Sequence, residues 1–135
     1  DEATALAAGH RPCGECRRAD FNRFKACWVA GNHHPITSIK AMDRVLHAER
    51  IDPQTRGKRT YQDAIDTLPD GTMIVLNDSA YLVWADAIWR WSPGGYDGRI
   101  PRPRSTTVTV LTPRSTVNAL RAGYVPQIAP LPLQL

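Results

Sequence analysis

The spacing of the apolar residues changes near residue 55, and this change limits the folds open to the chain. Within residues 20–30 and 38–50 apolar side chains recur every three or four positions, as on one face of a helix. After residue 60 short β-rich runs replace that pattern, and Pro, Gly and Asn separate them. A polar, basic stretch at 52–60 lies between the two patterns. We therefore expect an α+β fold in which a helical part precedes a small antiparallel sheet.

The helical part is predicted to span residues 1–52 and to hold about three helices. The first covers residues 1–9 and ends at Gly9, which suits a left-handed stop. The second covers residues 20–30, with Asp20 as its N-cap. The third covers residues 38–50, and the nearby Pro53 prevents its continuation.

The second part, residues 60–135, is predicted to hold the sheet and one helix, and to pack with the first part as one domain. Its β-rich runs lie at residues 72–76, 80–85, 88–91 and 106–111. Thr112 and Pro113 then fit the N-cap and first position of a helix that runs to Gly123. We expect loops at 92–98 and 101–104, an extended edge segment at 124–128, and a tail after it.

Composition favours a single domain with anionic partners. The 135 residues carry 17 Lys and Arg against 13 Asp and Glu, a net charge of +4. The uncharged apolar runs are far shorter than the ~18 residues that a membrane span needs, so we expect no membrane partner. Three cysteines are too few for a disulfide framework, and we therefore expect a reducing, cytoplasmic location.

The strongest chemical signal is the pair Cys13 and Cys16, which two residues separate, one of them glycine. Two thiolates at this spacing can bind one tetrahedral ion, in practice zinc. The remaining ligands are left open among His10, Cys27, His33, His34 and groups that precede Asp1 in a longer chain. A redox Cys-x-x-Cys and a turn without metal are the other interpretations.

Residues 2–17, from Glu2 through His10-Arg-Pro-Cys13-Gly-Glu-Cys16 to Arg17, resemble the second half of the N-terminal zinc-binding domain of Ada-type DNA-repair methyltransferases. The resemblance implies that Cys13 and Cys16 are zinc ligands. The other two cysteines of that family, one of them the methyl acceptor, lie upstream and have no counterpart after Asp1, so the resemblance extends to zinc binding alone. From residue 37 onward the sequence resembles uncharacterised bacterial proteins, which imply no activity.

A second resemblance points to an enzyme. Pro12-Cys13-Gly-Glu-Cys16 is similar to the cysteine turn of cytidine deaminases, and His47-Ala48-Glu49 is similar to their His-Ala-Glu. In this alternative Cys13, Cys16 and His47 hold zinc, and Glu49 is the general acid and base. The order of the two motifs is reversed relative to that family.

Basic residues follow the cysteine turn and suggest a surface for nucleic acid. They are Arg17, Arg18, Arg23 and Lys25, and a second group, Arg56, Lys58 and Arg59, lies in the polar loop. The sequence thus predicts a zinc-binding module that meets nucleic acid. The alternatives are a zinc-dependent, deaminase-like hydrolase and a metal-free interaction domain.

Overall fold

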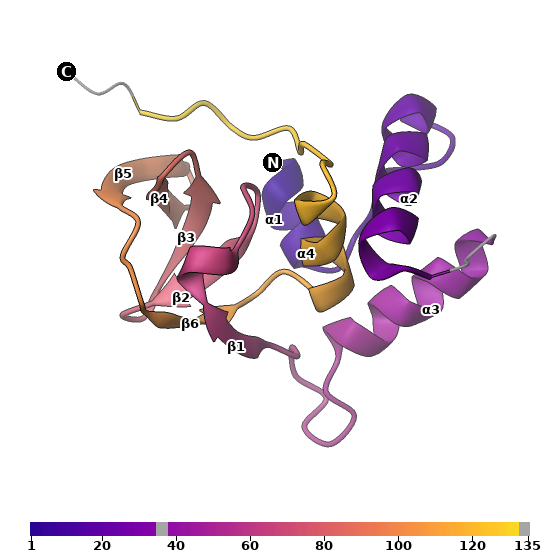
Figure 1. The fold of residues 1–135 in the computed structure, drawn as a ribbon, viewed down its shortest axis with the longest axis horizontal. Coiled ribbons are helices and arrows are strands. Elements are labelled where there is room, and N and C mark those ends of the chain that lie inside the picture. Colours follow the sequence, from indigo (N-terminus) through magenta and orange to yellow (C-terminus); the bar gives the residue numbers. More distant parts are fainter. Residues whose placement is uncertain (35–37, 133–135) are drawn as a thin grey trace.

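A computed structural model describes residues 1–34 and 38–132 (Figure 1). Three helices come first, followed by six strands with one short 3-10 helix, and then a last helix. The helices are α1 (Glu2–Ala7), α2 (Arg18–Asn32), α3 (Ile39–Arg50), η1 (Ile65–Thr67) and α4 (Arg114–Arg121). The strands are β1 (Tyr61–Ala64), β2 (Met73–Leu76), β3 (Ser79–Trp84), β4 (Ala87–Ser92), β5 (Gly95–Pro101) and β6 (Thr107–Val110). The predicted α+β class is confirmed.

The first helix, Glu2–Ala7, lies within the predicted range 1–9 and is one to two residues shorter at each end. Asp1 caps α1, because its carboxylate accepts from the backbone N–H of Thr4 at 3.0 Å and the Thr4 hydroxyl reaches back to the cap. Gly9 follows the helix with a φ of +92°, a conformation that side chains disfavour.

The predicted N-cap of the second helix is wrong. Helix α2 begins at Arg18, two residues before Asp20, and Arg17 occupies the cap position. The Asp20 carboxylate instead accepts from the Arg17 guanidinium at 2.7 Å and pairs with Arg23. The Asp20 side chain, which was expected to cap the helix, is thus bound by two arginines instead.

The predicted N-cap of the last helix is also wrong. Helix α4 has Pro113 at its cap position, and the hydroxyl of Thr112 accepts from the backbone N–H of Met73 at 2.9 Å. Glu49 of α3 supplies the acceptor at this end, since its carboxylate accepts from the N–H of Ser115 at 3.0 Å. A residue distant in sequence thus does the work of a local cap.

The six strands form one antiparallel sheet in the order β1-β6-β2-β3-β4-β5. Strands β2 to β5 follow each other as a meander, and β6 returns to pair with β2. Both tight turns of the β2–β4 meander carry positive φ at two residues, Asn77 and Asp78 in the first and Ala85 and Asp86 in the second. Strands β1 and β5 were not predicted, and β5 replaces an expected loop.

Side chains alternate between the two faces of the sheet and build two cores. One face packs on η1 and α4 through residues that include Ile74, Val83 and Val117. The other face packs on α1 through Met73 and Leu82.

The segment after α4 lies along the second face and forms no strand, which corrects the predicted edge segment at 124–128. Residues 129–132 of the predicted tail continue this segment, and 133–135 lie outside the described residues. Figure 1 shows the segment passing above α1 toward the sheet. The backbone N–H of Ala129 donates to Asp1 at 2.8 Å, and Ile128 and Leu131 pack on the core. The two ends of the described chain are therefore tied together.

A third core joins the helices to one another. It contains Phe24 and Trp28 of α2, Met42 of α3 and Leu120 of α4. Helices α2 and α4 approach so closely at Gly31 that an added Cβ would lie 2.1 Å from a backbone oxygen of Asn118. Although α4 belongs to the predicted β-rich part, it packs against both the helices and the sheet.

None of the helices within residues 1–34 and 38–132 has the length and apolar character needed to cross a membrane.

Candidate metal-binding site

Cys13 and Cys16 lie on one tight turn directly before α2. The backbone N–H of Arg17 donates to the carbonyl of Cys13 at 3.0 Å, which closes the turn. The N–H of Cys16 donates to the sulfur of Cys13 at 3.3 Å. Both cysteines are exposed, and neither forms a disulfide. The turn thus presents two neighbouring free thiols to solvent, with amide groups aimed at one of them.

The two thiols differ in acidity. The pKa of Cys13 is lowered, because its sulfur accepts from the N–H of Cys16 and then of Glu15, and from the thiol of Cys16. The pKa of Cys16 is raised, because its thiol donates to Cys13 and a negative charge there opposes its own ionisation. Cys13 is therefore the thiolate that forms first, and thiolates are the form that binds metal.

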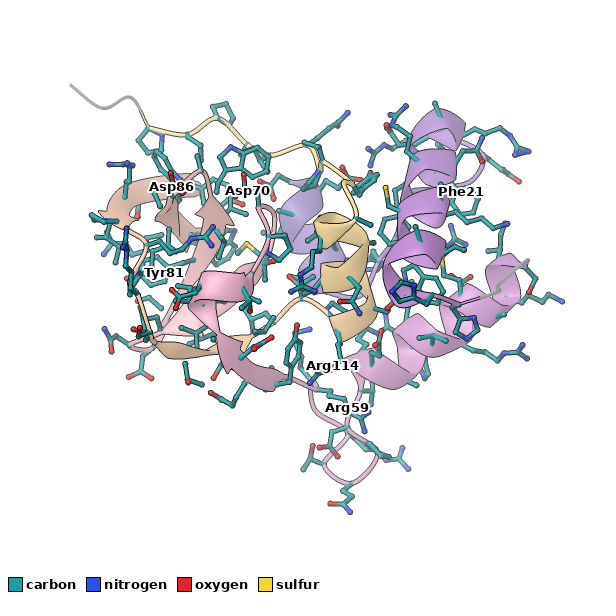
Figure 2. All side chains as sticks on the ribbon, viewed as in Figure 1. Phe21, Arg59, Asp70, Tyr81, Asp86 and Arg114 are labelled. Atoms are coloured by element: carbon teal, nitrogen blue, oxygen red, sulfur yellow. The ribbon has the colours of Figure 1, made fainter. Side chains whose placement is uncertain are left out.

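Arginine side chains on each side of the turn fix it to the rest of the molecule. Arg11 makes a two-pronged contact with Asp43 of α3, at 2.8 and 3.1 Å, and its guanidinium lies 5.2 Å from the ring centroid of Phe21. Figure 2 labels Phe21 on α2. After the cysteines, Arg17 bonds to Glu2 at 3.0 Å as well as to Asp20. The turn is thus held against α1, α2 and α3.

The other predicted ligands do not join the two cysteines. In the described part of the chain no three His, Cys, Asp or Glu side chains gather in a way that could hold a metal ion. His10 is exposed beside Asp1 and Glu2. Cys27 lies about two and a half turns into α2, about 13.5 Å along the helix from its first residue, Arg18, and burial raises the pKa of Cys27.

The remaining histidines lie away from the cysteine turn. His33 and His34 lie at the far end of α2, where the ring of His34 contacts that of Trp28 at a centroid distance of 5.7 Å. His47 is exposed on α3, 3.4 Å from the Arg50 guanidinium through Nδ1. The cysteine turn therefore offers two ligands from this chain.

Glu49 has a structural partner. Its carboxylate accepts from both the backbone N–H and the hydroxyl of Ser115, and the same hydroxyl accepts from Nε1 of the buried Trp28 at 3.0 Å. His47, two residues earlier, lies on the exposed side of α3. The arrangement therefore gives the deaminase-like alternative no support, since Glu49 is turned to α4 and His47 is not grouped with the cysteines.

The basic residues predicted to meet nucleic acid divide into two groups. Arg17 and Arg23 are engaged with carboxylates, both of them with Asp20. Arg18 is exposed and lines an open groove of about 410 Å³ beside Cys13, together with Glu15, Phe21 and Ile39. Lys25 is half-buried and has an interaction partner of its own. Of the four, only Arg18 adjoins the thiols with its charge exposed.

Sequence reasoning did not identify the residues that hold the turn in place. Arg11, Asp43 and Glu2 all bear on its position, but their partners are 32 and 15 residues away. The one local signal was the Arg-Pro pair before Cys13, because proline restricts the backbone of the residue before it. Long-range pairing of this kind leaves no spacing pattern in a single sequence.

Comparisons with protein-family models, with curated proteins and with solved structures find no match to this chain.

Proposed function

We propose that the protein is a zinc-binding module in which Cys13 and Cys16 provide two of the ligands. The observation that carries the proposal is the hydrogen bond from the N–H of Cys16 to the sulfur of Cys13 within a closed, solvent-exposed turn. Amide donors stabilise a thiolate and leave its other lone pairs free for a metal. The ion pairs of Arg11 and Arg17 support it further, because ligands on a fixed turn lose little freedom when they bind.

The residues fit zinc as half of a tetrahedral site. A bound zinc ion would cross-link the turn, as structural zinc does in small domains. The other two positions are left to water or to groups from another molecule, for which the open groove beside Cys13 leaves room. The exposed, unpaired thiols also support the proposal of a reducing, cytoplasmic location.

Metal titration of the purified protein tests the proposal. Cobalt(II) added to the reduced, metal-free protein should give thiolate-to-metal absorption bands, and zinc should abolish them. Cys13→Ala and Cys16→Ala should each lower the affinity at least about tenfold. Cys27→Ala is the matched control, because it removes a thiol from the same helix region and should leave the titration unchanged.

Titration curves that coincide for the wild type and Cys13→Ala would overturn the proposal. The metal-free interaction domain would then be the favoured alternative. The ratio at saturation adds information, since half an equivalent of metal per chain indicates that two copies share one ion.

Thiol–disulfide exchange is a second candidate, favoured by the unequal acidity of the two thiols. A lowered pKa at the first cysteine and a raised one at the second are the properties of an attacking and a resolving thiol. The same titration separates the two functions, because a pair that serves exchange alone needs no affinity for cobalt or zinc.

A further inference from the structure

A strip of positive charge runs along α3 and the loop that follows it. Lys40, Arg44 and His47 are spaced four and three residues apart, so they lie on one side of the helix and line a shallow groove of about 420 Å³. His47 also lines a second groove of about 640 Å³, together with Arg56 and Arg59 of the loop. The two grooves therefore adjoin at His47. We call these five residues the basic strip.

The carboxylates of the same segment are turned to other partners. Asp43 lines the smaller groove together with the basic residues, but its carboxylate is paired with Arg11. Glu49 accepts from Ser115 of α4, and Asp52 accepts from the backbone N–H of Gln54 at 2.8 Å within the loop. Arg11 thus neutralises Asp43, whereas Glu49 and Asp52 keep their charges and that of Asp52 acts on Arg59. The strip is positive because the cations of this segment outnumber its anions.

The cations of the strip are available to a ligand. Among the residues that the structure describes, Lys40, Arg44, Arg56 and Arg59 take part in no ion pair, and all four are exposed. Residues 40–59 carry six Lys or Arg and three Asp or Glu, so they account for +3 of the net charge of +4. Most of the excess charge of the molecule thus lies in this one segment of the chain.

The shape of the surface favours an extended polyanion over a single phosphate. The three helical positions alone span about 10 Å, at 1.5 Å per residue. The larger groove has an apolar floor formed by Ala48, Ile51 and Pro53, with Arg56 and Arg59 beside it. Arginines next to apolar atoms suit a chain of phosphates joined by sugars, because the guanidinium groups take the phosphates and the floor takes the sugars.

An anionic membrane fits less well. A peripheral membrane site combines basic side chains with large apolar ones that enter the lipid. In the described ranges four large apolar side chains are exposed, and only Ile39, at the start of α3, adjoins the strip. The other three, Trp91, Ile100 and Val125, lie on β4, β5 and the segment after α4. We infer that the basic strip binds the phosphate backbone of nucleic acid, without reading its sequence. This inference is independent of the cysteine turn.

Fluorescence anisotropy with labelled 20-base DNA, single-stranded and duplex, tests the inference. We expect binding of either form that weakens steeply with salt and is the same for unrelated sequences. Arg44→Ala/Arg59→Ala, which takes one cation from the helix and one from the loop, should weaken binding roughly tenfold or more and reduce the slope against log salt by about two.

The matched control is Arg99→Ala/Arg104→Ala, which removes the same charge from exposed positions on the opposite part of the chain. It should change the affinity less than about threefold. Equal losses for the two double variants, absence of DNA binding, or tighter binding to phosphatidylserine vesicles than to DNA would each overturn the inference. Circular dichroism of both variants shows whether the fold is intact, and Cys13→Ala should leave DNA binding unchanged.

Discussion

Ala85 has a backbone conformation that an L residue normally avoids. Its φ is +48° and that of Asp86 is +38°, as the turn between β3 and β4 requires. Glycine usually fills such positions because it has no Cβ to clash with the neighbouring carbonyl, and asparagine is tolerated because its side chain forms local hydrogen bonds. The turn is held by the pairing of Trp84 with Ala87 and by the bond from the N–H of Ala85 to Asp70.

Ala85→Gly is therefore expected to stabilise the protein by about 1 kcal/mol, since it removes the clash and keeps the backbone hydrogen bond. The midpoint of urea denaturation should rise. Ala80→Gly, within β3, is the control and should lower the midpoint, because glycine weakens a strand interior. A lower midpoint for Ala85→Gly would show that the left-handed conformation at this position costs nothing.

At the scale of residues, the sequence indicated which side chains lie at the helix ends more reliably than it indicated their hydrogen-bond partners. Asp1 and Gly9 do what their positions indicate, because their partners are within a few residues. Asp20 and Thr112 were both predicted as caps, and each has a different partner instead. Single-sequence reasoning cannot rank a local acceptor against a distant one that the fold brings close.

At the scale of elements, helix α4 joins the helical part to the sheet. Its inner side contributes Val117 to the sheet core and Leu120 to the helical core. Its first turn is fixed by Glu49 of α3, and Ser115 links that carboxylate to Trp28 of α2. Three helices therefore meet at one hydrogen-bonded point.

Glu49→Ala should destabilise the protein by about 2–3 kcal/mol, because the N–H and hydroxyl of the buried Ser115 then lack their acceptor. Urea denaturation followed by tryptophan fluorescence measures the loss. His47→Ala, on the exposed side of the same helix, should change stability by less than about 0.5 kcal/mol. If the two variants are equally stable, the Glu49–Ser115 contact does not support the helix junction.

The elements that the sequence predicted are those with a clear local pattern. The four predicted strands correspond to β2, β3, β4 and β6. Strand β5 was missed because its Gly and Pro content is typical of loops, and it is an edge strand, where such residues are tolerated. Strand β1 has four residues, too few to show alternation, and forms through its pairing with β6.

At the scale of the whole molecule, a tyrosine in or against each of the three cores makes the fold sensitive to alkali. Burial raises the pKa of Tyr61 and of Tyr96 to about 12, and burial and the contact with Glu2 raise that of Tyr124. Each phenol has a pKa of about 10 in the unfolded chain. Because the folded values are raised, this contribution to stability is complete below pH 10 and is lost as the pH rises toward 12.

We therefore expect the free energy of unfolding to fall between pH 10 and 12. Tyr96→Phe should make that fall shallower by up to about 2 kcal/mol over the interval, because it removes one ionising group. Denaturation curves at several pH values for the wild type and the variant give the comparison. Parallel pH profiles would show that Tyr96 ionises as easily in the fold as outside it.

For the candidate site, the sequence identified the two cysteines but not the residues that hold their turn in place. Cys13 and Cys16 are recognisable from spacing alone, and the structure places them on one exposed turn. The proposed nucleic-acid surface keeps Arg56 and Arg59 of the predicted loop group. Positions on α3 replace the residues after the turn, because Arg17 and Arg23 are bound by carboxylates. Charge counted along a sequence does not reveal which charges are already paired.

X-ray absorption at the zinc edge, on the protein loaded with one equivalent of zinc, shows whether the two thiols bind the ion. The account predicts a sulfur shell at about 2.3 Å that disappears in Cys13→Ala/Cys16→Ala and persists in Cys27→Ala. A spectrum that contains only nitrogen and oxygen neighbours at about 2.0–2.1 Å would contradict it.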